Sequence, residues 1–325
     1  MKLRVAVIYG GRSGEHDVSV RSARSVMDAM DPAKYERIEY FIDQQGKWTP
    51  QPILPEPGAQ TGIDVVFPVL HGTFGEDGTV QGLLELADLP YVGAGVLGSA
   101  VSMDKEMMKR VCAERMLPVV DYVSFPRGHA DLPAIIARMP FPVFVKPANL
   151  GSSVGISKAR NEEELAAAIA LAEQFDRKVI VERGIEGREL ECSVLGNEAP
   201  VASLPCEILP SREFYDYEDK YLLDRAETRL PAALPPAKTD ELRRLAVECY
   251  RAVECEGMGR VDFLLEAATD KLYINEINTI PGFTSISMYP KMWEHSGIGF
   301  ADLIDRLIEL ALDRDRRKKA TRFTR

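Results

Sequence analysis

The sequence predicts an α/β protein of two or three domains, the first of which contains a parallel sheet. The chain has 325 residues, more than one ordinary domain holds. Its opening stretch, Leu3-Arg-Val-Ala-Val-Ile-Tyr9, is apolar almost throughout, which is typical of a strand buried in a parallel sheet. Strand-like and helix-like segments then alternate over about 100 residues, the order that β-α-β units produce.

The first domain is expected to cover residues 1–101. A glycine-rich turn, Gly10-Gly-Arg-Ser-Gly-Glu-His16, follows the first strand. It lacks the G-x-G-x-x-G spacing of dinucleotide sites, so a Rossmann cofactor is not expected. The remaining elements are expected as a helix over 17–30, strands over 37–42 and 63–70, and a helix over 79–88.

A central domain is expected over residues 102–195, with strands at 142–146, 178–182 and 189–194. Between the first two of these strands, Asn161 and Glu164 have the spacing of a capping box, which predicts the start of a helix.

A third domain is expected over residues 196–312, with helices after Thr239 and from Phe300. The segment 205–236 has no period, and a loop of that length inside a compact domain is usually functional or disordered. Residues 313–325 are basic and are expected to form a solvated, disordered tail rather than a polyanion-binding segment.

Composition excludes several classes of function. The formal net charge is −10, which disfavours binding to nucleic acid or to an anionic membrane. The five cysteines form no C-x-x-C pair and are odd in number, so we expect reduced, buried thiols and a cytoplasmic protein. The apolar run from Val5 is too short for a secretory signal, and no stretch reaches transmembrane length.

The pattern with the most chemical content is a predicted hairpin late in the chain. Its strands are expected at 258–266 and 271–278, joined by a turn at 268–270. Because side chains alternate along a strand, this pairing sets Asp262 opposite Glu276 and Arg260 opposite Asn278. Opposed carboxylates repel unless a cation lies between them, and few hard oxygen ligands suit Mg²⁺ held partly by phosphates. The alternative is a solvated face on which Arg260 forms salt bridges.

Two loops could bind anions through their backbone. After the hairpin, Pro281-Gly282 lies among clustered hydroxyls, and glycine allows a ligand to approach the backbone N–H groups. Lys146 ends a predicted strand and precedes Gly151-Ser-Ser-Val-Gly155, which could surround phosphate oxygens, although no Walker A motif occurs in the chain. An ordinary mobile turn is the alternative for this loop.

Two further residues are candidates in the first domain. Glu15 lies near a helix start, where it could hold a substrate ammonium or merely favour the helix dipole. His71 follows a strand in a loop with three glycines, and loops of this kind often carry function. No second histidine lies near it in sequence, so we do not expect a metal ligand.

Taken together, four motifs resemble the D-alanine–D-alanine ligases, which are ATP-grasp enzymes. They are His71-Gly-Thr-Phe-Gly-Glu-Asp-Gly78, Lys146-Pro-Ala-Asn-Leu-Gly-Ser-Ser-Val-Gly155, Phe214-Tyr-Asp-Tyr-Glu-Asp-Lys-Tyr221 and Asn275-Glu-Ile-Asn-Thr-Ile-Pro-Gly-Phe-Thr284. The resemblance runs from Val5 to about Leu312. It implies three α/β domains, ATP between the central and C-terminal ones, and ligation of two D-alanines through a D-alanyl phosphate for peptidoglycan precursors.

The resemblance also implies roles for individual residues. Nucleotide contacts are implied for Lys105 and Lys146 at the phosphates, Glu182, Arg183 and Ile185 along the adenine, Glu189 at the ribose, and Ser153 and Lys220. Two Mg²⁺ ions are implied at Asp262, Glu276 and Asn278. The substrate residues implied are Glu15 and His71 for the first D-alanine, Ser152 and Tyr221 linked to Glu15, Arg260 and the Gly282 N–H for the oxyanion, and Ser287 and Met288 for the second D-alanine. Mn²⁺ as a substitute metal, K⁺ as an activator and a homodimer are further implications.

Two alternatives stay open at this stage. A relative that makes D-Ala-D-lactate or D-Ala-D-serine is the nearer one, although Lys220-Tyr221 resembles the dipeptide-forming members. The other is a nucleotide-sensing protein without catalysis. The presence of Arg260 beside Asp262, Glu276 and Asn278 argues against it, because ATP binding alone would not need an oxyanion partner.

Overall fold

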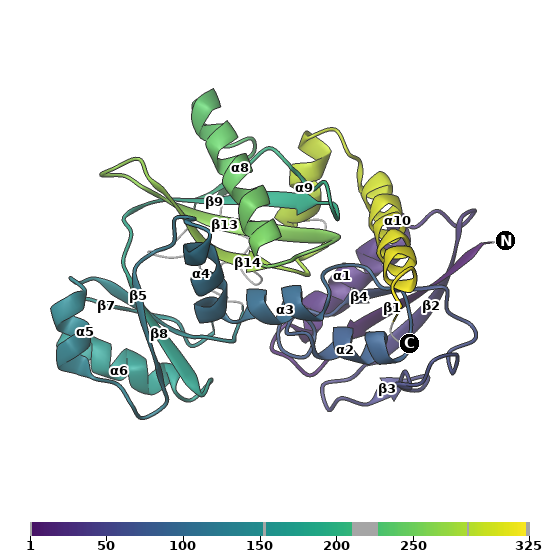
Figure 1. Ribbon diagram of the computed structural model, residues 1–325, viewed down its shortest axis with the longest axis horizontal. Helices are drawn as coiled ribbons and strands as arrows, with labels where there is room; N and C mark the ends of the chain where they lie inside the picture. The colour runs from purple at the N-terminus through teal and green to yellow at the C-terminus, as the bar shows by residue number, and fades with distance from the viewer. Residues whose placement is uncertain (1, 152–153, 210–226, 285, 323–325) are drawn as a thin grey trace.

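The protein is described here by a computed structural model that covers residues 2–151, 154–209, 227–284 and 286–322. It contains three sheets, which Figure 1 shows with the β5–β8 lobe at the left, β9 and β13 in the upper centre and β1, β2 and β4 at the right. The strands are β1 (Leu3–Gly10), β2 (Tyr35–Ile42), β3 (Trp48–Thr49), β4 (Val65–Val69), β5 (Tyr122–Pro126), β6 (Val143–Pro147), β7 (Ser157–Ala159), β8 (Lys178–Arg183), β9 (Gly187–Leu195), β10 (Val201–Ala202), β11 (Cys206–Leu209), β12 (Glu227–Arg229), β13 (Met258–Glu266) and β14 (Leu272–Asn278). The helices are α1 (His16–Ala29), α2 (Thr79–Leu86), α3 (Val96–Met103), α4 (Lys105–Glu114), α5 (Leu132–Arg138), α6 (Glu162–Ala172), α8 (Pro236–Ala252), α9 (Met288–His295) and α10 (Phe300–Lys319).

The first sheet has the order β3-β2-β1-β4, and β1 pairs in parallel with both β2 and β4, which confirms the predicted parallel sheet. Alternation along β1 sends Val5 and Val7 into one core with α1 and α10, and Ala6 and Ile8 into another with α2. The sheet is therefore covered by helices on both faces, as parallel sheets usually are.

The second sheet is antiparallel, with the order β5-β8-β6-β7. One face packs on α5 and α6 through Val143, Val145, Val179 and Val181. Because side chains alternate, Lys146 and Glu182 point to the opposite face, which is the one toward the third sheet. The Asn161 side chain caps α6 by accepting from the Glu164 N–H at 2.9 Å, as the capping spacing predicted.

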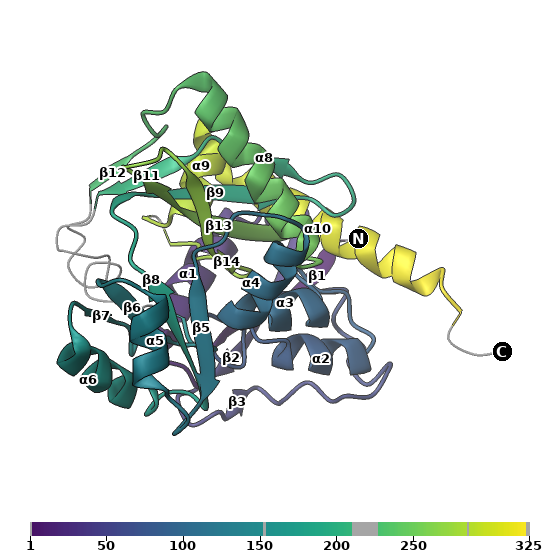
Figure 2. The ribbon, with the colours of Figure 1, turned by 60° about the vertical axis from the view of Figure 1, so that its left-hand side comes forward.

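The third sheet has the order β12-β11-β9-β13-β14, and β10 pairs with β9. Figure 2 shows α8 lying across this sheet, where Val261 and Phe263 of β13 pack with Leu190 of β9 in one core. The expected boundary at residue 195 is wrong for β9, because β9 pairs with β13 along its whole length. The second sheet ends with β8 at Arg183, so the sheets divide the chain between β8 and β9.

The expected disordered tail is wrong for residues 313–319, which continue α10 to Lys319. Several of its basic side chains have partners in the fold. Arg314 stacks on the Tyr91 ring and donates to the Tyr91 carbonyl at 2.7 Å, and Lys318 pairs with Glu85. Arg314 and Lys318 therefore hold α10 against the first domain.

All five cysteines are buried and free, as expected. Among the residues that the structure describes, no helix is long and apolar enough to cross a membrane.

Candidate active site

The predicted hairpin forms, and its register brings the expected acidic residues together. Asp262 pairs with Glu276, and Arg260 pairs with Asn278. On the other edge of β13, Asp262 also lies opposite Glu191 of β9. One face of the third sheet therefore carries carboxylates from three neighbouring strands.

This register arises differently from the expected one. The connection is four residues long, from 267 to 270, because Glu266 pairs with Lys271: the Glu266 N–H donates to the Lys271 carbonyl at 3.0 Å. The three-residue turn expected at 268–270 is therefore wrong. A β-bulge between Asp262 and Phe263 then shifts the pairing by one residue, restoring the predicted partners at the site.

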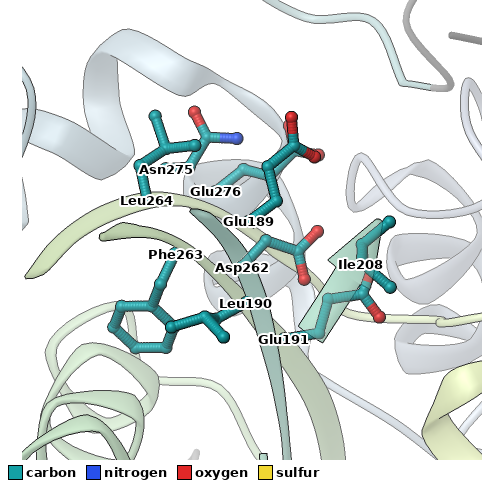
Figure 3. A pocket seen from close by; sticks show the side chains of 9 residues that line it. All are labelled: Glu189, Leu190, Glu191, Ile208, Asp262, Phe263, Leu264, Asn275 and Glu276. Atoms are coloured by element: carbon teal, nitrogen blue, oxygen red, sulfur yellow. The ribbon is translucent and has the colours of Figure 1, made fainter. Parts of the chain in front are cut away.

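The acidic face lines a pocket. In Figure 3 the carboxylates of Glu189, Glu191 and Asp262 point to one side of the strands, whereas Leu190 and Phe263 point to the other. Strand alternation explains this split between a polar pocket and an apolar core. The lining residues are Glu189, Leu190, Glu191, Ile208, Asp262, Phe263, Leu264, Asn275 and Glu276.

Arg260 is held on this face by two carboxylates. Its Nε and Nη2 atoms each donate to Asp262 at 2.7 Å, a bidentate pair, and Nε lies 3.3 Å from Glu191 Oε2. Asn278 Nδ2 also donates to Asp262 at 3.1 Å. We call Arg260, Asp262 and Glu191 the arginine cluster. The salt bridge of the alternative interpretation is thus present, but on a largely buried face rather than a solvated one.

Asp262, Glu276 and Asn278 fit a magnesium site that phosphate oxygens would complete. Mg²⁺ is usually bound through one or two carboxylates together with substrate phosphates and water. Asp262 and Glu276 are register partners, and Asn278 follows Glu276 on the same face. The described residues contain no group of three or more His, Cys, Asp or Glu side chains able to enclose a metal by themselves. A protein-only metal cage is therefore not what this face provides.

A second ionic group lies next to Asn275, one of the residues that line the pocket. The Glu182 carboxylate is buried between two ammonium groups, with Lys109 Nζ 3.0 Å from Oε1 and Lys146 Nζ 2.7 Å from Oε2. Burial alone would raise the pKa of Glu182, but the two lysines outweigh it and lower that pKa to about 2. Lys146 also donates to Asn275 Oδ1 at 3.2 Å. We call Lys109, Glu182 and Lys146 the lysine cluster.

The remaining residues expected at the nucleotide surround these clusters. Lys105, the first residue of α4, donates to the Leu150 carbonyl at 2.8 Å and lies 3.3 Å from Glu276. Arg183 pairs with Glu266 at 2.7 Å, and Ile185 lies in the connection between β8 and β9. The Glu182 carboxylate faces the two lysines, so a contact along an adenine would have to use its backbone.

The loop after β14 is held by side chains of the first domain. His71 Nδ1 lies 2.8 Å from the Ile280 carbonyl, so Nδ1 carries the proton and Nε2 accepts from Ser22 Oγ at 3.1 Å. Ser22 Oγ in turn accepts from the Phe283 N–H at 3.2 Å. Burial lowers the pKa of His71, which keeps the ring neutral. Both ring nitrogens thus have protein partners.

Glu76 fixes the same loop from a neighbouring turn. It accepts from the Ile280 N–H at 2.9 Å and from the Gly72 N–H at 2.9 Å. Burial, followed by the negative charge of Glu15, raises the pKa of Glu76 to about 8 despite these two donors. Ile280 and Phe283 are therefore tied to the first domain through His71, Glu76 and Ser22, which we call the junction contacts.

Glu15 lies where loops of two domains meet. It is 9% exposed and occupies the N-cap position of α1. A Cβ on Gly72 would lie 2.5 Å from Glu15 Oε2, and one on Gly151 would lie 3.3 Å from it. The structure thus brings Glu15 to the His71 loop and to the edge of the Gly/Ser loop, as expected. A side chain at position 72 would have to displace the Glu15 carboxylate, and one at position 151 would crowd it.

Gly282, Ser287 and Met288 lie together at the start of α9. A Cβ on Gly282 would be 2.7 Å from Ser287 Oγ, so the close approach needs glycine. Ser287 Oγ accepts from the Thr284 N–H at 3.0 Å and precedes Met288, the first residue of α9. Free N–H groups at a helix N-terminus attract anions, which suits a substrate carboxylate there.

Four expected site residues lie outside the described residues: Ser152, Ser153, Lys220 and Tyr221. Sequence reasoning missed five others that the structure places at the site, namely Ser22, Glu76, Lys109, Glu191 and Asn275. Glu191 shares a strand face with Glu189, and Lys109 follows Lys105 by one helical turn, so two of the five had a periodic signal. No periodic pattern indicated that Ser22 and Glu76 would contact the loop after β14. Asn275 lines the pocket because of the β-bulge opposite it.

Comparison with protein families gives two matches. Residues 111–309 match a model described as the D-ala D-ala ligase C-terminus. Residues 4–59 and 53–94 match one described as the D-ala D-ala ligase N-terminus. Together the two models cover most of the chain.

Individual proteins agree with these matches. A D-alanine–D-alanine ligase of Solibacter usitatus is 78% identical over 325 residues, covering all of both chains. D-alanine–D-alanine ligase A of Salmonella typhimurium is 43% identical, covering 99% of each chain. Among solved structures, the D-alanine–D-alanine ligase of Coxiella burnetii has a TM-score of 0.89 at 39% identity, covering 98% of this chain and 96% of that one. The VanG D-Ala:D-Ser ligase of Enterococcus faecalis has a TM-score of 0.87 at 35% identity, covering 96% and 100%.

Proposed function

The chain belongs to the D-alanine–D-alanine ligase family and has its ATP-grasp fold, and on that premise we propose how its own residues join two D-alanines. The observation that carries the proposal is the hairpin register, which sets Asp262 against Glu276 with Arg260 beside them. The reaction forms D-alanyl-D-alanine from two D-alanines with conversion of ATP to ADP and phosphate, as peptidoglycan precursor synthesis requires.

In the first step, a carboxylate oxygen of the first D-alanine takes the γ-phosphoryl group of ATP, giving D-alanyl phosphate and ADP. Phosphoryl transfer depends mainly on positioning and on neutralising charge. Two buried lysines would face the phosphates: Lys105, which lies beside Glu276, and Lys146, which lies beside Asn275. Bound Mg²⁺ at Asp262, Glu276 and Asn278 would supply further neutralisation of the phosphate oxygens.

In the second step, the amine of the second D-alanine attacks the acyl carbon, the C–O bond to phosphate breaks, and the amine loses a proton. The developing oxyanion needs donors fixed in advance. Arg260, held by Asp262 and Glu191, and the Gly282 N–H would supply them. Glu15, beside the His71 loop, would hold the ammonium of the first D-alanine, and Ser287 with Met288 would receive the carboxylate of the second.

We further propose two Mg²⁺ ions per site, with Mn²⁺ as a substitute and K⁺ as an activator, and a homodimeric assembly. A cytoplasmic location is proposed as well, since the five cysteines are free and ATP is the substrate. Ser152, Ser153, Lys220 and Tyr221 keep their proposed roles in closing the site and binding ATP.

One alternative substrate is favoured by a specific likeness. The VanG protein, 35% identical, is named for D-Ala:D-Ser ligation, so D-serine is the second candidate for the second substrate position. The choice concerns only the attacking amine, because both products need the same D-alanyl phosphate.

The test is phosphate release with ATP, Mg²⁺ and either D-alanine or L-alanine, with the product identified by mass. We expect release with D-alanine and a product of D-alanyl-D-alanine mass. D-Serine and D-lactate are then offered beside D-alanine in competition. The proposal would be overturned by phosphate release with L-alanine but not with D-alanine. It would also be overturned if D-alanyl-D-serine or D-alanyl-D-lactate predominated over D-alanyl-D-alanine in the competition.

A further inference from the structure

Lys109 is the most deeply buried charged group of the site. Its side chain is 0% exposed, whereas those of Lys105 and Lys146 are 6% and 10% exposed. It follows Lys105 by four residues on α4, and so lies one turn further from the pocket mouth on the same helix face. Lys109 therefore cannot contact a ligand that Lys105 and Lys146 meet at the surface of the pocket.

The only carboxylate that the structure gives Lys109 as a close partner, within the described part of the chain, is Glu182. That carboxylate is shared, since its other oxygen pairs with Lys146 at 2.7 Å. Lys146 has a further partner in Asn275 Oδ1, on the pocket side. The lysine cluster thus contains one cation that can turn toward the pocket and one that cannot.

A buried carboxylate that loses its only cation carries a large electrostatic penalty. If Glu182 had Lys146 alone, binding a phosphate through Lys146 would leave Glu182 without a counter-ion. Glu182 would then compete with the phosphate for the same ammonium group. A second, permanently buried lysine removes that competition.

We propose that Lys109 is a positioning residue that neutralises Glu182 so that Lys146 is available to the nucleotide phosphates. The inference rests on the proposed function in one respect, namely that Lys146 binds phosphate. It adds a role for a residue that touches neither substrate nor nucleotide.

The test is a double-mutant cycle with Lys109→Met and Glu182→Gln. In the wild-type background, Lys109→Met should raise the KM for ATP, and the Kd for ADP, by about tenfold or more, which corresponds to roughly 1.4 kcal/mol. The KM for D-alanine should not change. In the Glu182→Gln background the same change should have little effect, because no carboxylate then competes. An equal rise in both backgrounds, or no rise in the wild type, would overturn the proposal.

Lys178→Met is the matched control. Lys178 is a partly buried lysine that contacts the same helix through two carboxylates, Asp104 at its N-cap at 2.6 Å and Glu106 in its first turn at 2.8 Å. Its loss should lower the melting temperature and leave the KM for ATP within about twofold. A rise as large as that of Lys109→Met would show that loosening α4 is sufficient, which would also overturn the proposal.

Lys109→Arg keeps the charge and guards against misfolding of the methionine variant. It should retain an ADP Kd near that of the wild type, and a Kd as weak as that of Lys109→Met would contradict a role of charge. ADP binding separates the two proposals. A wild-type protein that binds no nucleotide contradicts the proposed function, whereas normal binding that is insensitive to Lys109 contradicts only this inference.

Discussion

The two sides of the candidate site are held by different kinds of contact. On the sheet side, the arginine cluster and the lysine cluster pair charged side chains with one another at 2.7–3.3 Å. On the domain-junction side, Ser22, His71 and Glu76 bind backbone groups of Ile280 and Phe283. The first side contains groups that a charged ligand can attract, and the second contains groups that only fix a loop.

This difference indicates a division of labour. Charge pairs can exchange partners when phosphates and cations arrive, because the new partner replaces the old electrostatic interaction. Side-chain contacts to a backbone amide or carbonyl have no such replacement, and a buried backbone group that loses its partner is costly. Changes on the sheet side should therefore reduce chemistry most, and changes at the junction should mainly reduce stability.

The largest effect is expected from Glu276→Ala on the sheet side. The change removes the register partner of Asp262 and a proposed metal ligand, so turnover should fall below detection. Phosphate release at saturating Mg²⁺ measures it. Glu248→Ala, which removes an exposed carboxylate paired with Arg244 on α8, is the control and should leave turnover unchanged. Near-normal release from Glu276→Ala would contradict the metal assignment.

The next largest effect is expected from Arg260→Met in the arginine cluster. Loss of one oxyanion donor typically lowers kcat by roughly 10²–10³. The KM for ATP should change much less, because Arg260 is proposed to act on the acyl carbon rather than on the nucleotide. Steady-state kinetics with varied ATP separate the two parameters. A large rise in the KM for ATP with an unchanged kcat would assign Arg260 to the nucleotide instead.

At the junction, Ser22→Ala should act on stability more than on chemistry. It removes the acceptor of the buried Phe283 N–H and the donor to His71, which should lower the free energy of unfolding by about 1–3 kcal/mol. The kcat should fall only severalfold through the loosened Gly282 loop. Ser25→Ala is the matched control, since Ser25 is only partly buried on the same helix and its hydroxyl bonds to the Arg21 carbonyl of that helix. Equal urea midpoints for the two variants would contradict a stabilising role of Ser22 at the domain junction.

The last prediction is a pH dependence of stability from Glu76. Its pKa is raised from 4.5 to about 8 in the folded protein, so between these pH values the folded state binds a proton that the unfolded state has lost. Stability should therefore fall as pH rises from about 4.5 to 8, with a slope of roughly 1.4 kcal/mol per pH unit at most. Below pH 4.5 Glu76 contributes no slope, and above pH 8 the full loss remains.

Urea denaturation of the wild type and of Glu76→Gln at several pH values measures this slope. The variant should show the shallower fall, whatever its absolute stability, because glutamine does not titrate. Parallel pH dependences would contradict the raised pKa of Glu76.

Sequence reasoning reached the sheet side because alternation along a strand is a local property. Spacing alone placed Glu276 and Asn278 on one face of their strand, and the assumed hairpin added Asp262 to it. Their partners were correct even though the turn was not, because the bulge offsets the longer connection. The same alternation would have predicted that Glu191 shares a strand face with Glu189.

The junction side could not be predicted in this way. Ile280 lies 204 residues from Glu76, and Phe283 lies 261 residues from Ser22. Which backbone group a serine or glutamate meets over such separations depends on how two domains pack, and no local period encodes it. The resemblance to a family predicted that His71 lies at the site. It did not predict the hydrogen bonds of its ring to the Ile280 carbonyl and to Ser22.

The packing of α10 has a consequence for synthesis of the chain. Leu303, Leu307 and Ile308 fill the same core as Val5 and Val7 of β1, so β1 completes this core only after α10 has been synthesised. Until then this face of the first sheet is covered by α1 but lacks the cover of α10. The nascent first domain is thus expected to need protection from aggregation, whereas the sheet of β5–β8, whose apolar face is covered by the nearby α5 and α6, can close soon after it emerges.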